Sequence, residues 1–416
     1  MSMRVLEASE AAVYVAEKLV SRGSAIEPKV ERTVGRIVGE IRAKGDEALR
    51  KYARELDGLG EKESVLVSRR ELEAARRQVS PEFAPAIERA ARNIRRFAEW
   101  QMPRSWVRTM EPGIRVGQRV EAVASVGCYV PGGRYPLPSS VLMTVIPAQV
   151  AGVKRIQVAS PRPAPETLAA AAMLGVECFY RMGGAQAVAA FAYGTDSVPR
   201  VAKIVGPGNS YVTAAKKMVA FDCSIDMLAG PTEAIVFADR GNAAFFASDL
   251  VAQAEHDPET LPIFVTTNLR LAQEVAKAAK AMAADNPIAC KSLSENGVAL
   301  VATDADEAFV WINAIAAEHL TVDAANLHRV SDAGSVFVGE YSPQSLGDYA
   351  SGPNHVLPTG GVARYRGGLS VLDYLKIVSV QQVSKSGLKR IAPAVALLAE
   401  AEGLKAHAES VRVRIQ

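Results

Sequence analysis

A regular alternation of strand-like and helix-like runs, from about residue 120 onward, constrains this chain more than any other feature. Ala-rich helical runs such as PETLAAAAMLG and LRLAQEVAKAAKAMA separate short runs that are rich in β-branched residues. The main strand-like runs are AVASVGCYV, RIQVAS, AKIVG, EAIVFAD, LPIFVTT and GVALVAT. Strands that alternate with helices favour right-handed crossovers and a parallel sheet. The sequence therefore predicts an α/β fold.

The alternation is interrupted near the Gly-Pro of LAGPTEA (228–234), and its two halves predict two lobes with a cleft between them. Before the alternating region, residues 1 to about 100 are charged and mostly helical in pattern. After the alternating region, the last fifty residues are helical again and no strand follows them. We expect this tail to pack on a lobe of its own chain or on a partner subunit. The predicted fold is α/β, with two Rossmann-like parallel-sheet lobes and helical N-terminal and C-terminal extensions.

The composition excludes several classes of protein. The 48 basic residues nearly balance the 45 acidic ones, which argues against a nucleic-acid-binding protein. The cysteines form no CxxC pair, so neither a zinc ribbon nor a disulfide framework is indicated; they are Cys128, Cys178, Cys223 and Cys290. The N-terminus lacks a signal-peptide arrangement, and no apolar run reaches transmembrane length. We therefore expect a soluble, cytoplasmic protein with a large core.

Four of the five histidines have a carboxylate or an amide nearby in the sequence: His256, His319, His355 and His407. In VAQAEHDPET, Gln253 and His256 are three residues apart and project from one face of the same turn. One such histidine alone is more often a surface or core imidazole, but four together weaken that interpretation. Gln253, His256, Asp348 and His407 would supply two nitrogens and two oxygens. This mixed set suits a catalytic zinc site.

The pair Glu318-His319, in AAEHL, is a second candidate site. We expect it at the end of a helix, where both side chains can point into one cleft as two general bases. A solvated helix terminus is the alternative, because adjacent side chains on a helix diverge.

Three glycine-rich segments each follow a strand signal and lead towards a helix: GCYVPGG (127–133), GGAQAVAAFAYG (183–194) and VGPGNSYV (205–212). α/β proteins bind phosphates and nucleotides at such helix N-termini. None of the segments matches G-x-G-x-x-G, so simple turn glycines remain the alternative.

Seven segments, taken in order, resemble the succession of motifs in the histidinol dehydrogenase family. They are YVPGGRYPLPSSVLM, GGAQAVAAFAYGT, KIVGPGNSYV, IDMLAGPTE, DLVAQAEHDPE, AEHL and GDYASGPNHVLPTGG. The resemblance runs from about residue 120 to the C-terminal GLKAH. It implies the last enzyme of histidine biosynthesis, which oxidises L-histidinol through an aldehyde to L-histidine, reduces two NAD⁺ in succession and binds zinc.

The resemblance also implies roles for single residues. It assigns zinc to Gln253, His256, Asp348 and His407, acid–base catalysis to Glu318 and His319, and NAD binding to Tyr129, Gln186 and Asn209. It assigns substrate binding to Thr232, Gln253, His256, Glu318, Asp348, His355, Glu402 and His407. Thr232 stands where the family more often has serine, and threonine keeps the hydroxyl group. Thr144 stands where asparagine is expected. The family is a homodimer whose tail reaches the neighbouring subunit, so Glu402 and His407 are expected to serve the partner's active site.

We accordingly expect four parts in the chain. Residues 1–23 would form an N-terminal helical extension, and 24–128 with 233–365 a discontinuous first lobe. Residues 129–232 would form the second, NAD-binding lobe, and 366–416 a helical dimerisation tail.

Two alternatives to the histidinol activity stay open. One is a related dehydrogenase of another polyol, such as a sulfonated propanediol, which would need an extra cation near the sulfonate. The sequence offers no obvious candidate for that cation, with Arg134 left open. The other is a non-catalytic metal-binding protein on the same fold, which the presence of every proposed ligand and base disfavours.

Overall fold

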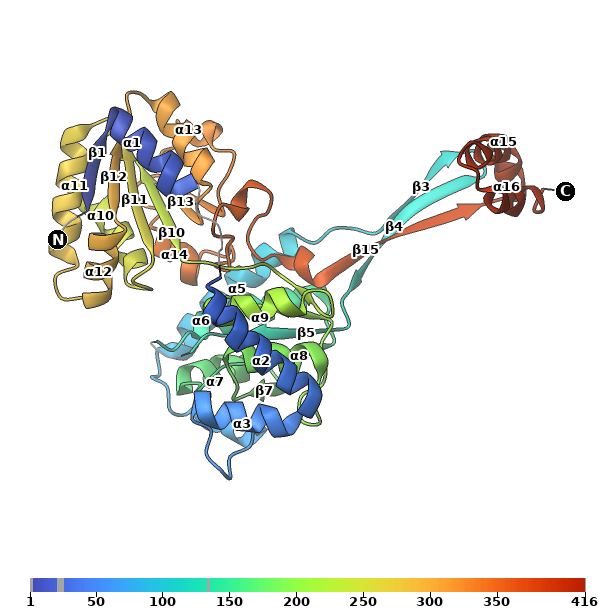
Figure 1. Ribbon diagram of the computed structural model, residues 1–416, viewed down its shortest axis with the longest axis horizontal. Coiled ribbons are helices and arrows are strands. Elements are labelled where there is room, and N and C mark those ends of the chain that lie inside the picture. Colours follow the sequence, from blue (N-terminus) through green and yellow to red (C-terminus); the bar gives the residue numbers. More distant parts are fainter. Residues whose placement is uncertain (1–2, 21–25, 133–134, 416) are drawn as a thin grey trace.

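The computed structural model describes residues 3–20, 26–132 and 135–415, which form two α/β lobes and a long projecting arm (Figure 1). Lobe 1 comprises residues 3–20 and 233–349, lobe 2 comprises 28–100 and 125–227, and the arm comprises 106–122 and 375–412. Within the described ranges, no helix is long and apolar enough to cross a membrane. The predicted α/β class with parallel sheets is confirmed.

Lobe 1 is built on a six-stranded parallel sheet in the order β1-β12-β11-β10-β13-β14. Its strands are β1(Arg4–Glu7), β10(Glu233–Phe237), β11(Leu261–Thr266), β12(Val298–Val301), β13(His319–Val322) and β14(Ser335–Val338). Its helices are α1(Ala8–Tyr14), the π-helical η1(Val15–Val20), α10(Ala243–Ala254), α11(Leu269–Met282), α12(Pro287–Glu295), α13(Ala305–Ile315) and α14(Gln344–Tyr349).

Lobe 2 repeats this plan in the order β2-β7-β6-β5-β8-β9, with only the β2–β7 pair antiparallel. Its strands are β2(Leu66–Val67), β5(Ser125–Tyr129), β6(Arg155–Ala159), β7(Cys178–Tyr180), β8(Lys203–Val205) and β9(Ser224–Ile225). Its helices are α2(Pro28–Lys44), α3(Asp46–Asp57), α4(Arg69–Ala75), α5(Phe83–Trp100), α6(Pro138–Ala151), α7(Pro165–Met173), α8(Gly184–Tyr193) and α9(Ser210–Val219).

Helices cover both faces of each sheet, which explains why the central strands are apolar throughout. In β10, Ile235 and Phe237 belong to one buried cluster, and Val236 belongs to the cluster on the opposite face. Successive strand side chains point to opposite faces, so a strand buried on both sides must be hydrophobic at every position. In lobe 1, β11 and β12 are added on one side of β10, and β13 and β14 on the other side. In lobe 2, β6 and β7 lie on one side of β5, and β8 and β9 on the other. The strand order therefore reverses at β10/β13 and at β5/β8.

The arm is a three-stranded antiparallel sheet that carries two helices at its tip (Figure 1). Its strands are β3(Trp106–Glu111), β4(Ile114–Ala122) and β15(Leu375–Val383), and its helices are α15(Lys385–Ala401) and α16(Lys405–Arg412). Many apolar side chains on it are exposed, including Met110, Ile377 and Leu397. The arm therefore presents surface that its own chain does not cover.

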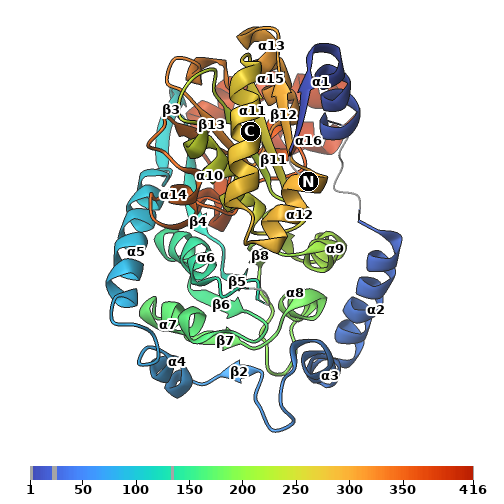
Figure 2. The ribbon, with the colours of Figure 1, turned by 90° about the vertical axis from the view of Figure 1, so that its left-hand side faces the viewer.

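The structure divides the chain at different points from those expected. Residues 4–7 of the expected N-terminal helical extension form β1, which pairs with β12 inside lobe 1. The segment 24–128 belongs to lobe 2 rather than lobe 1, because α2 buries its apolar face against α8 and α9, and β5 pairs with β6 and β8 (Figure 2). The C-terminal tail is helical only after β15, whose pairing with β4 extends the arm. A single sequence does not reveal these long-range pairings.

Candidate active site

The candidate catalytic residues lie at the amino-terminal edge of the lobe 1 sheet. His319 is the first residue of β13 and pairs with Ala234 of β10, so Glu318 and Glu233 lie side by side at this edge. The expectation of a helix end was wrong, because α13 stops at Ile315 and Ala316 adopts a left-handed conformation that ends the helix. Both side chains are nevertheless buried in one cluster, as the chemistry requires.

The hydrogen bonds of His319 define which ring nitrogen is basic. Nε2 lies 3.2 Å from Oδ1 of Asp348, and an ionised carboxylate only accepts, so the proton of the neutral ring sits on Nε2. Nδ1 is buried without a hydrogen-bond partner among the described residues and lies 4.0 Å from Oε1 of Glu318. Burial acts to lower the pKa of His319, but the bond to Asp348 and the two carboxylate charges outweigh it and raise this pKa. Nδ1 is therefore the atom free to accept a proton.

Glu318 is the second base of the cluster. The pKa of Glu318 is raised to about 7. Burial is the largest cause and the neighbouring Glu233 and Asp348 carboxylates add to it, while the charge of His319 and a hydrogen bond from Thr232 oppose it. Its Oε2 is buried without a partner in the part of the chain that the structure describes. A carboxyl group with a pKa near neutrality exchanges protons readily at physiological pH.

Asp348, on α14, connects the cluster to the candidate metal ligands. Its Oδ2 accepts from Nε2 of Gln253 at 3.0 Å, while its Oδ1 accepts from His319. Burial acts to raise the pKa of Asp348, but the hydrogen bond and charges of the surrounding histidines, His256 among them, bring it below the ordinary value. Asp348 is therefore held ionised, as a metal ligand must be.

Three of the four predicted zinc ligands thus meet at one place. Gln253 contacts Asp348 directly, and His256, in the turn that follows α10, is close enough to act electrostatically on the same carboxylate. A half-turn of the Gln253 amide would present its oxygen in place of its nitrogen. Among the residues that the structure describes, no three His, Cys, Asp or Glu side chains form a complete metal site. The donor set fits zinc in chemistry but needs a fourth ligand.

The fourth predicted ligand lies far from the other three within this chain. His407 is on α16 and Glu402 is the residue that ends α15, both exposed at the tip of the arm. The tip projects away from α10 and α14, which carry the other ligands (Figure 1). One chain therefore does not bring all the predicted site residues together.

The remaining predicted residues of this region border the cluster. Thr232 hydrogen-bonds Glu318, and His355 donates from Nδ1 to the backbone oxygen of Asp348 at 2.7 Å. Nε2 of His355 faces Oγ of Ser140 on α6 of lobe 2, at 3.3 Å, so this contact crosses between the lobes. Thr144 is buried on α6 and donates to the backbone oxygen of Ser140 at 2.7 Å, which makes it part of the helix packing.

The three predicted NAD-binding residues gather at the carboxyl-terminal edge of the lobe 2 sheet. Tyr129 ends β5, Asn209 caps α9 just after β8, and Gln186 lies in the first turn of α8 after β7. In open parallel sheets, ligands bind at this edge beside the point where the strand order reverses, which here is β5/β8. Arg134, the cation left open for a sulfonate, lies outside the described residues.

A buried ion pair that we did not predict supports this edge. Nζ of Lys216 lies 2.5 Å from Oδ1 of Asp226 and donates to the backbone oxygen of Gly206 at 2.6 Å. Oδ2 of Asp226 accepts from the Gly206 N–H at 2.7 Å, so the pair holds both polar groups of that glycine. Gly206 has φ +115° and packs on the Tyr129 carbonyl, which leaves no room for a side chain. Lys216 lies in SYVTAAKKMVAF. The one sequence signal of its burial is that the other residues on its side of this helix are apolar.

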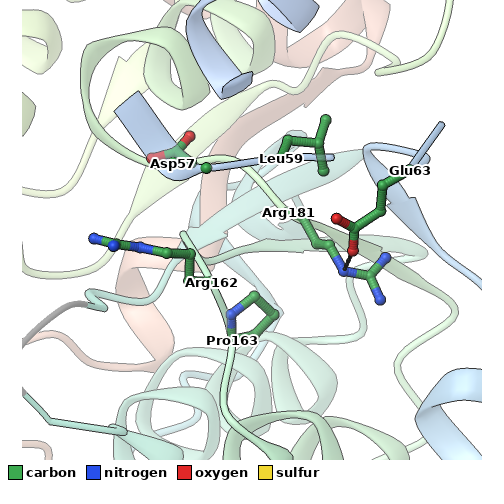
Figure 3. A pocket seen from close by; sticks show the side chains of 7 residues that line it. Asp57, Leu59, Glu63, Arg162, Pro163 and Arg181 are labelled. Atoms are coloured by element: carbon green, nitrogen blue, oxygen red, sulfur yellow. Dashed lines mark ion pairs between the residues drawn. The ribbon is translucent and has the colours of Figure 1, made fainter. Parts of the chain in front are cut away.

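A second unpredicted feature is a cavity of about 230 Å³ near Gln186. Asp57, Gly58, Leu59, Glu63, Arg162, Pro163 and Arg181 line it (Figure 3). Asp57 is buried at the end of α3, and Arg162 and Arg181 come from the loops after β6 and β7. No sequence signal marked Asp57, because its partners lie more than a hundred residues away.

Two α/β lobes with a buried acid–base cluster between them define an enzyme. The histidinol dehydrogenase family model matches residues 20–415. The chain is 45% identical to histidinol dehydrogenase of Methanosarcina mazei, covering 96% of this chain and 94% of that protein, and 44% identical to that of Geobacter sulfurreducens, covering 96% of each. The crystal structure of histidinol dehydrogenase from Elizabethkingia anophelis superposes with a TM-score of 0.93 at 34% identity, covering 99% of this chain and 98% of that one. The chain belongs to the histidinol dehydrogenase family and is an oxidoreductase of histidine biosynthesis.

Proposed function

We propose that this chain catalyses the zinc-dependent, NAD-linked, four-electron oxidation of L-histidinol via L-histidinal to L-histidine, acting as a cytoplasmic homodimer. The observation that carries the proposal is the pairing of two proton acceptors, Nδ1 of His319 and Oε2 of Glu318, which lack partners among the described residues and lie in one buried cluster beside Asp348 and Gln253. Two separate oxidations need two separate proton transfers, and the cluster offers one base for each.

Gln253, His256 and Asp348 would hold the zinc ion, with His407 of the partner subunit as the fourth ligand. Bound zinc would anchor the imidazole and amino groups of histidinol and so orient the carbinol carbon that reacts. Thr232 and His355, at the border of the cluster, would contact the substrate.

His319 serves the first oxidation. Asp348 holds the imidazole with its proton on Nε2, so Nδ1 takes the hydroxyl proton while the carbinol carbon loses a hydride. Bound NAD⁺ would supply the hydride acceptor for each of the two oxidations. The nearby Glu318 carboxylate, 4.0 Å from Nδ1, stabilises the imidazolium that forms.

Glu318 serves the second oxidation. As a carboxylate it takes a proton from the water that adds to the aldehyde carbon, and the resulting hydrate anion then loses the second hydride to give the carboxylic acid, which ionises to the carboxylate product. Its pKa of about 7 leaves much of it ionised at physiological pH, yet basic enough to accept the proton. Burial of the cluster between the lobes would protect the aldehyde from side reactions.

The dinucleotide would bind at the carboxyl-terminal edge of lobe 2, on Tyr129, Gln186 and Asn209. The position of these residues beside the β5/β8 reversal supports this placement.

The arm would complete the site of a second subunit. Its apolar side chains, such as Met110 and Leu397, are exposed, and Glu402 and His407 are exposed at its tip, away from the other predicted site residues (Figure 1). In a two-fold dimer, each tip would supply these residues to the other subunit's cluster.

The first test mixes purified protein with NAD⁺ and L-histidinol and follows NADH absorbance, with the sulfonated propanediol in parallel. We expect two NADH per histidinol, activity lost on chelation and restored by zinc. Turnover of the propanediol alone would assign the chain to the related polyol dehydrogenases, and no turnover of either would refute the proposed function.

The dimer is tested by mixing two inactive variants, Gln253→Ala and His407→Asn, under conditions of subunit exchange. Random pairing of a two-fold dimer leaves about a quarter of all sites intact, so about a quarter of the wild-type rate should return. Mixtures that stay inactive would show that the tail serves its own subunit.

A further inference from the structure

The amide of Gln186 is held from one side by a buried carboxylate. Oδ2 of Asp57 accepts from Nε2 of Gln186 at 2.9 Å and from the Gly183 N–H at the start of α8, also at 2.9 Å. These groups come from the end of α3 and the first turn of α8, and 129 residues of chain separate Asp57 from Gln186. Asp57 also lines the cavity of Figure 3, so it stands between that cavity and Gln186.

This contact determines which atom of the Gln186 amide faces Asp57 and which faces away from it. An ionised carboxylate accepts hydrogen bonds and does not donate them, so the NH₂ group must face Asp57. The carbonyl oxygen Oε1 is then directed away from Asp57. It is buried without a partner within the described part of the chain, although a buried acceptor without a partner carries a free-energy cost.

A hydrogen-bond donor also lies beside Gly184. The Tyr129 hydroxyl oxygen accepts from the Gly184 N–H at 3.1 Å, which leaves the hydroxyl hydrogen free to donate. A side chain at Gly184 would come within 3.0 Å of Oε1 of Gln186, and its φ of +52° also favours glycine. The first residue of α8 is thus close to both the tyrosine donor and the glutamine acceptor.

We propose that Asp57 is a positioning residue for dinucleotide binding: it fixes Gln186 so that its carbonyl oxygen, beside the Tyr129 hydroxyl, receives a hydrogen-bond donor of the dinucleotide. The inference rests on the proposed function, since it assumes that NAD binds at this edge. Three kinds of group in the ligand carry such a donor beside an acceptor, namely the carboxamide of the nicotinamide, the amino group of the adenine and the hydroxyls of the two riboses.

The variant Asp57→Ala tests the orientation of the amide. It removes the acceptor that holds the Gln186 NH₂ group and so frees the amide to turn this group towards the ligand. The ligand donor would then meet a second donor, and the Kd of NADH, measured by fluorescence titration, should rise about tenfold. Asp57→Asn is the conservative variant: its amide oxygen can take the place of Oδ2 and accept from both Gly183 and Gln186, so its Kd should stay within about threefold of wild type.

Glu63→Gln is the matched control. Glu63 lines the same cavity, but its carboxylate contacts Arg181 and the Gly60 N–H rather than Gln186. We expect its Kd for NADH to stay at the wild-type value. An unchanged Kd in a folded Asp57→Ala variant, or a tenfold rise in Asp57→Asn, would overturn the proposal.

Dinucleotide analogues identify the ligand donor without any variant. The 3-acetylpyridine analogue lacks the amide N–H, the hypoxanthine analogue lacks the adenine amino group, and deoxyribose analogues each lack one ribose hydroxyl. One of these should bind wild-type protein about tenfold more weakly than NADH. Binding of all of them as tight as that of NADH would overturn the proposal even if Asp57→Ala failed to fold. Protein that binds NADH but leaves histidinol unoxidised would refute the proposed substrate and leave this inference intact, whereas protein that does not bind NADH would refute both.

Discussion

The two lobes share one strand order but use opposite edges of their sheets. In lobe 2, Tyr129 and Asn209 lie at the carboxyl-terminal edge, where the order reverses between β5 and β8. In lobe 1, the order reverses between β10 and β13, yet Glu318 and His319 lie at the amino-terminal edge of the same strands. The edge preference of open parallel sheets therefore holds for the lobe that binds a nucleotide in our proposal and not for the lobe with the acid–base pair.

The two edges also differ in how their polar atoms are partnered. At the lobe 1 edge, Nδ1 of His319 and Oε2 of Glu318 are buried without partners among the described residues. At the lobe 2 edge, Lys216 and Asp226 hold Gly206 through both of its backbone groups, and Asn209 caps α9. The atom described there as buried without a partner, Oε1 of Gln186, is an amide oxygen and not a base. Basic atoms without hydrogen-bond partners can accept protons, whereas polar groups that are fully hydrogen-bonded stabilise the backbone conformation. We therefore expect lobe 1 substitutions to change rates and lobe 2 substitutions to change stability and binding.

His319→Gln should give the largest effect and is the sharpest test of this division. The Gln side chain can still donate to Asp348 but offers no ring nitrogen to accept the hydroxyl proton. We expect kcat for histidinol to fall by about 10²- to 10⁴-fold, the usual contribution of a general base. The thermal unfolding midpoint should stay close to wild type. A variant that unfolds early but keeps its kcat would show that His319 is structural.

Glu318→Gln should lower the rate of L-histidinal oxidation and also remove the dependence of this rate on pH. Because the pKa of Glu318 is raised to about 7, the active carboxylate form grows as the pH rises through 7, and oxidation of supplied L-histidinal should rise with it and then level off. The variant should be slower by about 10²-fold and should lack this rise. If the same rise persisted in Glu318→Gln, another group would be the base.

Lys216→Met tests the structural character of the lobe 2 edge. Removing one member of a buried ion pair leaves the other charge uncompensated, which should lower the free energy of unfolding by about 3–5 kcal/mol. The adjacent Lys217 provides a control, since its pair with Glu31 is largely exposed and Lys217→Met should cost less than about 1 kcal/mol. Denaturant titration measures both. Equal losses of unfolding free energy in the two variants would contradict a stabilising role for the buried Lys216–Asp226 pair.

The sequence predicts the chemistry of this molecule better than its partition into lobes. The alternation of strands and helices predicts both sheets, and the order of motifs predicts that Gln253, Asp348, Glu318 and His319 share a site, because those signals are local or carried by a family resemblance. Placing 24–128 failed because the apolar face of α2 does not say which lobe it will cover. Asp57 stayed hidden for the same reason: a buried carboxylate is recognised by its partners, and these are distant in the chain.

Asn209 should give the smallest effect, and it separates the two roles that one side chain can have at the lobe 2 edge. Its Oδ1 accepts from the Tyr211 and Val212 N–H groups and so caps α9, while its NH₂ group is left for the dinucleotide. Asn209→Ala should lose the cap, at a cost of about 1 kcal/mol in unfolding free energy, together with the ligand contact. Asn209→Asp keeps the cap but replaces the donor with a negative charge, so it should unfold like wild type and bind NADH several-fold more weakly. If the aspartate variant bound NADH as tightly as wild type, Asn209 would be a cap and nothing more, and only Tyr129 and Gln186 would remain as ligand-binding residues of this edge.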